Sequence, residues 1–146
     1  MRPNDLDALG HVNNAVALEY FEAGRWDWMR RRGLAPSTGV AAVVERVDVT
    51  YHAEIPCGQV EVRTELTSPT AAEFDWDDLT YRARFAQRLH LSGKASPAVA
   101  ALVTVAFIDA RRRCPVSMQE FLADAGARRS TTPSSHLSVS MGERNE

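Results

Sequence analysis

The clearest hydrophobic pattern in the chain has a helical period and lies close to its first residues. The residues of one helical face recur at spacings of four, three and four: Ala17, Phe21, Gly24 and Trp28. Asn13 or Asn14 can cap the first turn, and Gly33 offers a stop after a basic last turn. The pattern predicts one long helix over roughly 14–32, apolar enough to be a central element.

After a turn-rich stretch at 36–39, the hydrophobic period changes from 3.6 to two, which indicates strands. Apolar and polar residues alternate over 47–51, 60–66 and 79–85, so each of these strands should have one buried and one wetter face. The segment 99–108 is apolar at both parities. It is therefore expected to be a central strand that is covered on both sides.

The last predicted element is a short helix. Ser117 is followed three residues later by Glu120, which is a capping-box pattern, and Gly126 offers a stop. Residues 127–146 are rich in Ser, Thr, Arg and Pro and are predicted to form a disordered tail. The sequence thus predicts one α+β domain over 1–126, in which an antiparallel sheet curls about a long helix.

Composition agrees with a single globular domain. The 146 residues are 45% hydrophobic and 25% charged, with a net charge of -2, so neither a disordered chain nor a nucleic-acid partner is indicated. Two basic runs, 30–32 and 111–113, favour either a solvated surface or contact with a phosphorylated ligand. An open sheet also leaves an edge strand and an uncovered face, so a homodimer or homotetramer is expected.

The cysteines, the histidines and the apolar runs of the chain indicate its cellular compartment and bear on metal binding. Cys57 and Cys114 are far apart, no charged and then apolar leader is seen, and no apolar run reaches the roughly 20 residues of a membrane span. We therefore expect a soluble cytoplasmic protein with no membrane partner. The four histidines are too scattered to predict a metal site: His11, His52, His90 and His136.

The segment before the long helix carries a specific motif. Residues 5–14 read DLDALGHVNN, and residues 19–26 read EYFEAGRW. Together they resemble the signature of hotdog-fold thioesterases of the 4-hydroxybenzoyl-CoA type and of the related long-chain acyl-CoA thioesterases. The resemblance extends more loosely through Tyr51 and Gly58 and covers roughly 2–116.

The resemblance implies a five- or six-stranded antiparallel sheet wrapped around a helix, paired into dimers with active sites at the subunit interface. It implies hydrolysis of coenzyme A or acyl-carrier-protein thioesters without a metal or another cofactor. The aspartate of the motif matches Asp7, which would act as nucleophile or general base. Family members usually have a strand before the motif, so an upstream extension of the reading frame is expected to encode one.

The residues themselves fit this chemistry. A thioester has a good leaving group, so its hydrolysis needs a carboxylate, here Asp7, and hydrogen-bond donors for the oxyanion. Unpaired amides at the helix start, around Gly10 to Val12, can supply the donors, and Gly10 leaves room for the acyl group. Without its neighbours, however, Asp7 would be interpreted as a helix cap.

His11 and Glu54 are weaker candidates for catalysis. His11 can be a hydrogen-bonded turn residue or can orient the substrate or Asp7, and similarity to plant acyl-carrier-protein thioesterases suggests a more direct part. In that comparison Glu54 falls near a later catalytic glutamate, whereas Leu9 stands where those enzymes have asparagine. The candidate substrate-binding residues are Gly10, Val12, Asn13, Asn14 and Tyr20, although capping alone would account for the two asparagines.

Other interpretations stay open. Glu22 and Arg25 stand three residues apart and predict either a surface ion pair or a lining of the substrate entrance. The leading hypothesis is an acyl-CoA thioesterase that acts on a fatty or aromatic acyl group. The alternatives are a non-catalytic hotdog module that binds acyl thioesters and a hotdog dehydratase or hydratase, whose Asn-Pro-containing motif the chain does not match.

Overall fold

The structure is a computed structural model, and it describes residues 6–34 and 39–131. The described elements follow one another in the order α1 (Asn14–Arg31), β1 (Val40–Tyr51), β2 (Val60–Ser68), β3 (Arg82–Leu91), β4 (Val99–Asp109), β5 (Cys114–Val116) and α2 (Met118–Thr131). This order and the predicted α+β class agree. The helix predicted over roughly 14–32 is confirmed to within one residue at its end.

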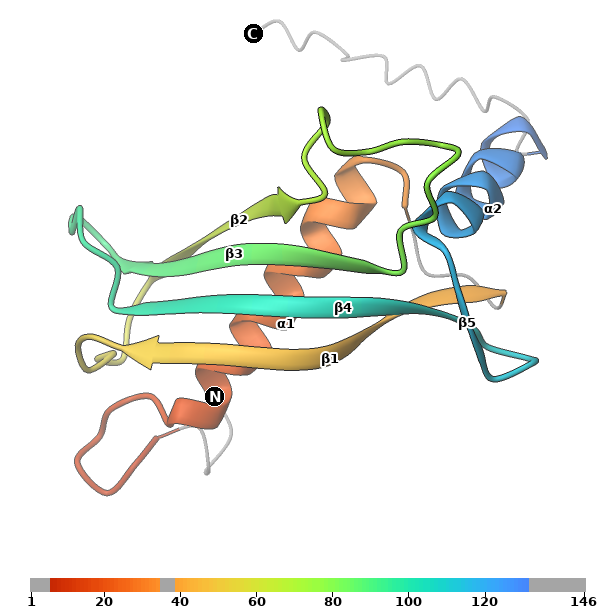
Figure 1. Cartoon of the computed structure of the whole chain (residues 1–146). Coiled ribbons are helices and arrows are strands. Elements are labelled where there is room, and N and C mark those ends of the chain that lie inside the picture. Colours follow the sequence, from red (N-terminus) through yellow and green to blue (C-terminus); the bar gives the residue numbers. More distant parts are fainter. Residues whose placement is uncertain (1–5, 35–38, 132–146) are drawn as a thin grey trace, which may run out of the picture.

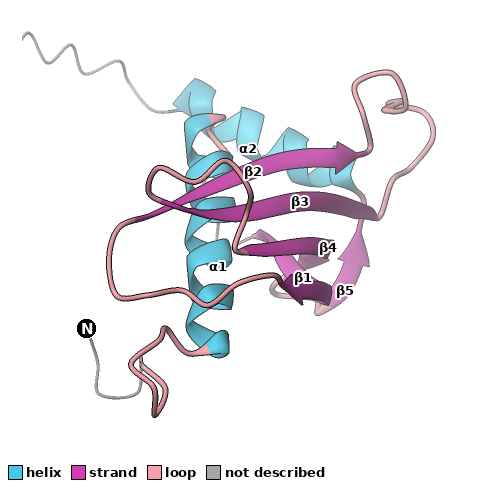
Figure 2. Ribbon diagram, turned by 90° about the vertical axis from the view of Figure 1, so that its left-hand side faces the viewer, coloured by secondary structure: helices cyan, strands magenta, loops and turns pink. Residues whose placement is uncertain are grey.

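The strands form one antiparallel sheet in the order β1-β4-β3-β2, and β5 pairs with the end of β4 (Figure 1). α1 lies across one face of this sheet and packs mainly on β2 and β3 (Figure 2). In the described part of the chain, β1 and β2 are therefore the two long edge strands, and the short β5, which pairs only with β4, forms a third edge. β1 is the edge farther from α1, which leaves part of its helix-facing side uncovered.

α1 has a cap at each end and packs one continuous apolar face against the sheet. The Asn13 side chain accepts a hydrogen bond from the Ala15 amide at 3.0 Å, and Gly33 ends the helix with φ 69°. Gly24 allows the helix to approach β2 closely, since a Cβ there would lie 2.8 Å from Val62 Cγ1. The fully buried centre of this face consists of Ala17 and Phe21.

Two predicted strand boundaries were wrong. β1 begins earlier, at Val40, and β3 begins later, at Arg82, so the alternating residues Leu79 and Tyr81 lie outside the strand and are 54% and 44% exposed. The backbone before β3 bonds elsewhere: the Thr80 amide donates to the Gln119 side chain at 3.1 Å. Alternation alone cannot distinguish a strand from a loop whose hydrogen bonds go to another element.

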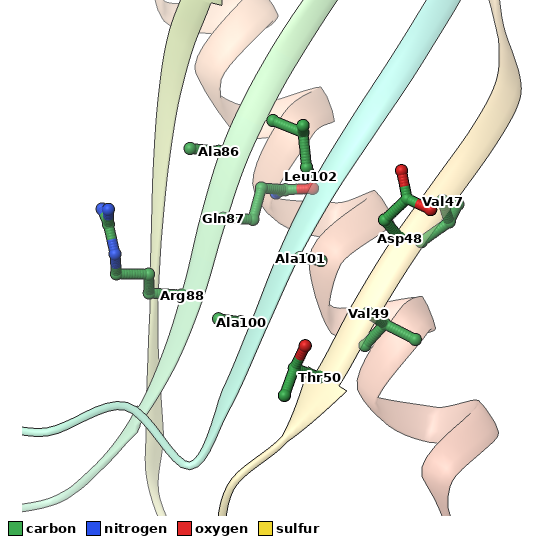
Figure 3. Close-up of a pocket in the computed structure, with 10 residues that line it drawn as sticks. All are labelled: Val47, Asp48, Val49, Thr50, Ala86, Gln87, Arg88, Ala100, Ala101 and Leu102. Atoms are coloured by element: carbon green, nitrogen blue, oxygen red, sulfur yellow. The ribbon is translucent and has the colours of Figure 1, made fainter.

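The expectation that residues 99–108 are covered on both sides was also wrong. β4 is central in the sheet, but buried residues alternate along it with partly exposed ones, and Leu102 is 38% exposed. Its outer side helps to line a shallow hollow of about 630 Å³ on the face opposite α1 (Figure 3). Ala100 and Ala106 are apolar but small, so apolar character at this parity does not require burial.

α2 begins as predicted but ends later. The Ser117 amide donates to Glu120 at 2.9 Å and the Glu120 amide donates to Ser117 Oγ at 3.1 Å, which confirms the capping box. The stop predicted at Gly126 is wrong, because α2 continues to Thr131. A glycine inside a helix costs only about 1 kcal/mol relative to alanine, which packing can offset. The rest of the predicted tail, 132–146, and the expected upstream strand lie outside the described residues.

Candidate active site

The loop that precedes α1 folds back on itself. Leu6 and Val12 form an antiparallel bridge, and the Asp7 amide donates to the His11 carbonyl at 2.7 Å. Gly10 closes the turn with φ 82°, a conformation that glycine adopts without steric cost, and its amide donates to the Asp7 carbonyl at 3.1 Å. The turn therefore places the Asp7 side chain beside His11.

The Asp7 carboxylate is fixed by backbone donors. Its Oδ1 accepts hydrogen bonds from the amides of Leu9 at 2.8 Å and His11 at 2.9 Å. The His11 amide is the main cause that holds the pKa of Asp7 below its ordinary value, because hydrogen bonds to the charged form favour it. Oδ2 accepts no bond from a described backbone amide and lies 3.8 Å from His11 Nδ1. Asp7 thus has one carboxylate oxygen held by the backbone and one that faces the His11 imidazole.

His11 lies between two carboxylates. Its Nε2 is 3.3 Å from Glu54 Oε2, and its buried Nδ1, on the side of Asp7, has no hydrogen-bond partner among the described residues. The Val12 amide donates to the Ile55 carbonyl at 2.8 Å, which holds the loop against the segment that carries Glu54. The structure therefore brings together all three predicted catalytic residues, although the Glu54 side chain is 71% exposed.

These three residues open on one cleft of about 270 Å³, here called the Asp7 cleft. Its other lining residues are Val12, Asn14, Tyr51, His52, Ala53 and Ile55. Two predicted substrate-binding residues, Val12 and Asn14, thus lie in the cleft. Gly10 forms the turn, Asn13 caps α1, and Tyr20 packs against the core, so these three do not line it.

The loop amides are engaged within the protein. Gly10 and His11 donate to Asp7, and Val12 donates to Ile55, so these amides have acceptors before any substrate arrives. Among the described residues, the amide of Asn14 has no acceptor, as is typical of a first helical position. Asn14 also lines the cleft, which makes its amide a better-placed oxyanion donor than those of residues 10–12.

Sequence reasoning missed two lining residues and one buried network. The Tyr51 hydroxyl donates to the Asn14 carbonyl at 2.9 Å, and burial raises the Tyr51 pKa. His52 lines the cleft beside it.

Arg25, expected as a surface partner of Glu22 or an entrance residue, is only 8% exposed and donates to Gln87 Oε1 at 2.7 Å. The predicted surface pair is therefore wrong, and a polar residue at the buried parity of a strand was the available signal for Gln87.

The structure also bears on the expectations about metal ligands, membrane spans and the two basic runs. Over residues 6–34 and 39–131, no cluster of potential metal ligands occurs and no helix is long and apolar enough to cross a membrane. Both basic runs contain arginines that pair locally: Arg30 and Arg31 with Asp27, and Arg112 with Asp109. These pairs favour a solvated surface as the interpretation of the two runs.

Comparison with known proteins places the chain in a family. A family model described as the thioesterase-like superfamily matches residues 1–126. The chain belongs to this superfamily. A comparison with curated proteins finds no significant match.

Solved structures share the fold of this thioesterase-like chain at low identity. The PA5185 protein of Pseudomonas aeruginosa has a TM-score of 0.69 at 23% identity, covering 88% of this chain and 85% of that one. The YbaW probable thioesterase of Escherichia coli has a TM-score of 0.63 at 21% identity, with 86% and 90% covered. The DHNA-CoA thioesterase of Staphylococcus aureus has a TM-score of 0.66 at 17% identity, with 89% and 86% covered. The predicted hotdog fold is confirmed, and family membership supports thioester hydrolysis in general.

Proposed function

We propose that the protein hydrolyses an acyl-CoA thioester to the free acid and coenzyme A, with Asp7 as the reacting carboxylate. The observation that carries the proposal is the Asp7 carboxylate, held by two backbone amides and open on the Asp7 cleft. The similar Staphylococcus aureus protein is a DHNA-CoA thioesterase, so a CoA thioester is the substrate of at least one protein with this fold. A carboxylate and an oxyanion donor are sufficient for a leaving group as good as a thiolate.

Of the two roles for Asp7, the lowered pKa favours direct attack over general-base catalysis. A general base works best with a pKa near the working pH, whereas the backbone donors hold the pKa of Asp7 low. In the proposed path, Oδ2 attacks the carbonyl carbon, the C–S bond breaks, and the thiolate leaves. Water then hydrolyses the acyl-aspartate anhydride, which releases the acid and restores the carboxylate.

The other residues of the cleft assist this path. The Asn14 amide, at the positive end of α1, is proposed to stabilise the oxyanion. The His11 imidazole, 3.3 Å from Glu54 and 3.8 Å from Asp7, is proposed to give the departing thiolate a proton. Glu54 would stabilise the charged imidazole, but weakly, because its side chain is mostly exposed.

Thiol release from purified protein tests the proposal. A panel of fatty and aromatic acyl-CoAs, each also presented on acyl carrier protein, is expected to include thioesters that are hydrolysed with a kcat of at least about 1 per second. Saturable binding of the same thioesters, seen as a rise in melting temperature without turnover, would instead identify a non-catalytic module. Formation of a double bond or of a hydroxyacyl product would identify a dehydratase or hydratase.

We also propose that two copies pair through the β1 edge. The helix-facing side of this edge strand exposes three large side chains: Val44 at 48%, Val47 at 36% and Tyr51 at 38%. An antiparallel pairing centred on Glu45 and Arg46 would set Val44 against Val47 of the partner subunit. Such a pairing would satisfy the open backbone groups of the edge and bury the apolar side chains together.

Replacing Val47 with aspartate is expected to convert the dimer to a monomer, because the pairing would bury an unpaired charge. The dimer dissociation constant should rise by about a hundredfold or more, measured by size-exclusion chromatography with light scattering across protein concentrations. Leu79→Asp is the matched control, since Leu79 is 54% exposed and lies outside the strands. A dimer of unchanged affinity in the Val47 variant would exclude this edge as the interface.

A further inference from the structure

Arg25 is a buried cation that has no counterion among residues 6–34 and 39–131. Its side chain is 8% exposed, and its only hydrogen-bond partner among the described residues is the neutral Gln87, 2.7 Å away. No carboxylate of those residues forms an ion pair with it, and Glu22 influences it only through space. Buried charges in proteins are normally paired, so an unpaired guanidinium points to a missing anion.

Arg25 lines an apolar cleft of about 310 Å³ between α1 and β1, here called the α1–β1 cleft. Its walls are mainly apolar side chains: Trp26, Met29, Val44, Phe85 and Val105. No nitrogen of Arg25 is both buried and without a partner, so the donors that Gln87 does not use reach the open cleft. An apolar cleft with one fixed cation suits a ligand with an apolar body and a single anionic end.

The Asp7 cleft and the α1–β1 cleft lie at two ends of one stripe of α1. Asn14, Leu18 and Glu22 follow one another at four-residue spacing, and Arg25 continues the stripe three residues later. Arg25 lies eleven positions after Asn14, which is about 16 Å along the helix axis. Between them Leu18 is 38% exposed, and Val47 faces the same side at 36%. The proposed partner would close this apolar path on its open side.

We propose that the α1–β1 cleft is the distal acyl subsite of the enzyme, and that Arg25 selects acyl groups with a carboxylate at the end opposite the thioester. The substrates would be CoA monothioesters of dicarboxylic acids. This inference rests on the proposed thioesterase function. A fork of N–H donors pairs well with a carboxylate, and the low-dielectric surroundings strengthen that pair. A methyl end would leave the guanidinium as unpaired as it is now.

Glu22 gives the proposal a second, opposite test. Its side chain is exposed and lines the mouth of the same cleft. A substrate carboxylate at Arg25 would be repelled by Glu22, so removing the Glu22 charge should favour such a substrate. This substitution changes no buried group, which keeps the test independent of the fold.

The experiment measures kcat/KM for two series of acyl-CoAs of equal length. One series carries a terminal carboxylate (succinyl, adipoyl, suberoyl, sebacoyl and dodecanedioyl), and the other carries a terminal methyl (butyryl to dodecanoyl). At the length that reaches Arg25, the carboxylate series is expected to be preferred. Arg25→Gln should lower that preference by about tenfold to a hundredfold, the value of a hydrogen-bonded charge. Glu22→Gln should raise it by about twofold to fivefold.

Controls separate recognition from folding. Arg31→Gln on the same helix removes an exposed charge that pairs with Asp27 and should leave the preference unchanged. Arg25→Lys keeps a cation and should retain part of the preference even if Arg25→Gln does not fold. The proposal is overturned if no chain length favours the carboxylate, if the preference survives in Arg25→Gln, or if both series lose activity equally.

Binding separates this inference from the proposed function. Non-hydrolysable thioether analogues of sebacoyl-CoA and decanoyl-CoA can be titrated by calorimetry into the full-length protein. If no thioester is turned over, the proposed hydrolysis fails, yet a tighter Kd for the carboxylate analogue that depends on Arg25 would still support the subsite. Equal affinities for the two analogues would exclude a carboxylate-binding subsite at Arg25.

Discussion

Replacing Asp7 with asparagine is expected to lower kcat by about a hundredfold to ten-thousandfold or more, with little change in melting temperature. The asparagine Oδ1 can still accept the amides of Leu9 and His11, so the turn should keep its shape. Only the ionised Oδ2, the proposed nucleophile, is lost. Steady-state thiol release on the best substrate of the panel gives kcat, and circular dichroism gives the melting temperature.

A matched control exists for this substitution. Asp75 also accepts a nearby backbone amide, that of Asp77 at 2.9 Å, and lies outside the Asp7 cleft. Asp75→Asn should therefore retain full activity. An Asp7→Asn variant as active as the wild-type protein would eliminate Asp7 as the reacting group. Entry of ¹⁸O from labelled water into the Asp7 carboxylate during turnover would identify Asp7 as the nucleophile, because water that attacks the Asp7 carbon of the anhydride leaves its oxygen on that side chain.

The loop that carries Asp7 and His11 could be predicted because its determinants are local. The turn glycine at residue 10 and the helix cap at residue 13 act within a few residues. The position of Asp7 and His11 before the helix could therefore be predicted from the sequence. Glu54 was predicted only through resemblance, because it depends on how the segment after β1 packs against the loop. Its contact with His11 spans more than forty residues and leaves no periodic signal.

The parts that sequence reasoning missed depend on contacts between distant elements. Arg25 stands on a helix among charged neighbours, so its spacing from Glu22 predicted a surface pair. Arg25 is buried because α1 crosses β3 at this point, where Gln87 Oε1 accepts a hydrogen bond from it. The exposed residues just before β3 likewise alternate as a strand would, and only their bonds to α2 reveal a loop. Periodicity reports the face of one element, not the partner of that face.

Gln87 is expected to contribute most to stability among the polar residues of the core. Its Oε1 accepts from Arg25 at 2.7 Å, and its Nε2 donates to the Phe21 carbonyl and to Thr64 Oγ1, both at 2.8 Å. These bonds join α1 to β2 and β3 at the point where Gly24 lets the helix approach closely. Gln87→Leu would leave the buried Arg25 guanidinium without its hydrogen-bond acceptor and would remove the bonds to the Phe21 carbonyl and to Thr64 Oγ1. The free energy of unfolding should fall by about 2–4 kcal/mol.

Urea denaturation at a fixed protein concentration measures this loss, because dimerisation would make stability depend on concentration. Gln59→Leu is the control, since Gln59 is exposed and precedes β2, and it should change stability by no more than about 0.5 kcal/mol. The double variant Arg25→Met, Gln87→Leu should recover part of the loss, because removing both partners leaves no buried charge to satisfy. Additive losses in the double variant would mean that Arg25 and Gln87 are not energetically coupled. In that case the Arg25 cation would already be satisfied by solvent in the α1–β1 cleft, and a substrate carboxylate would gain little there.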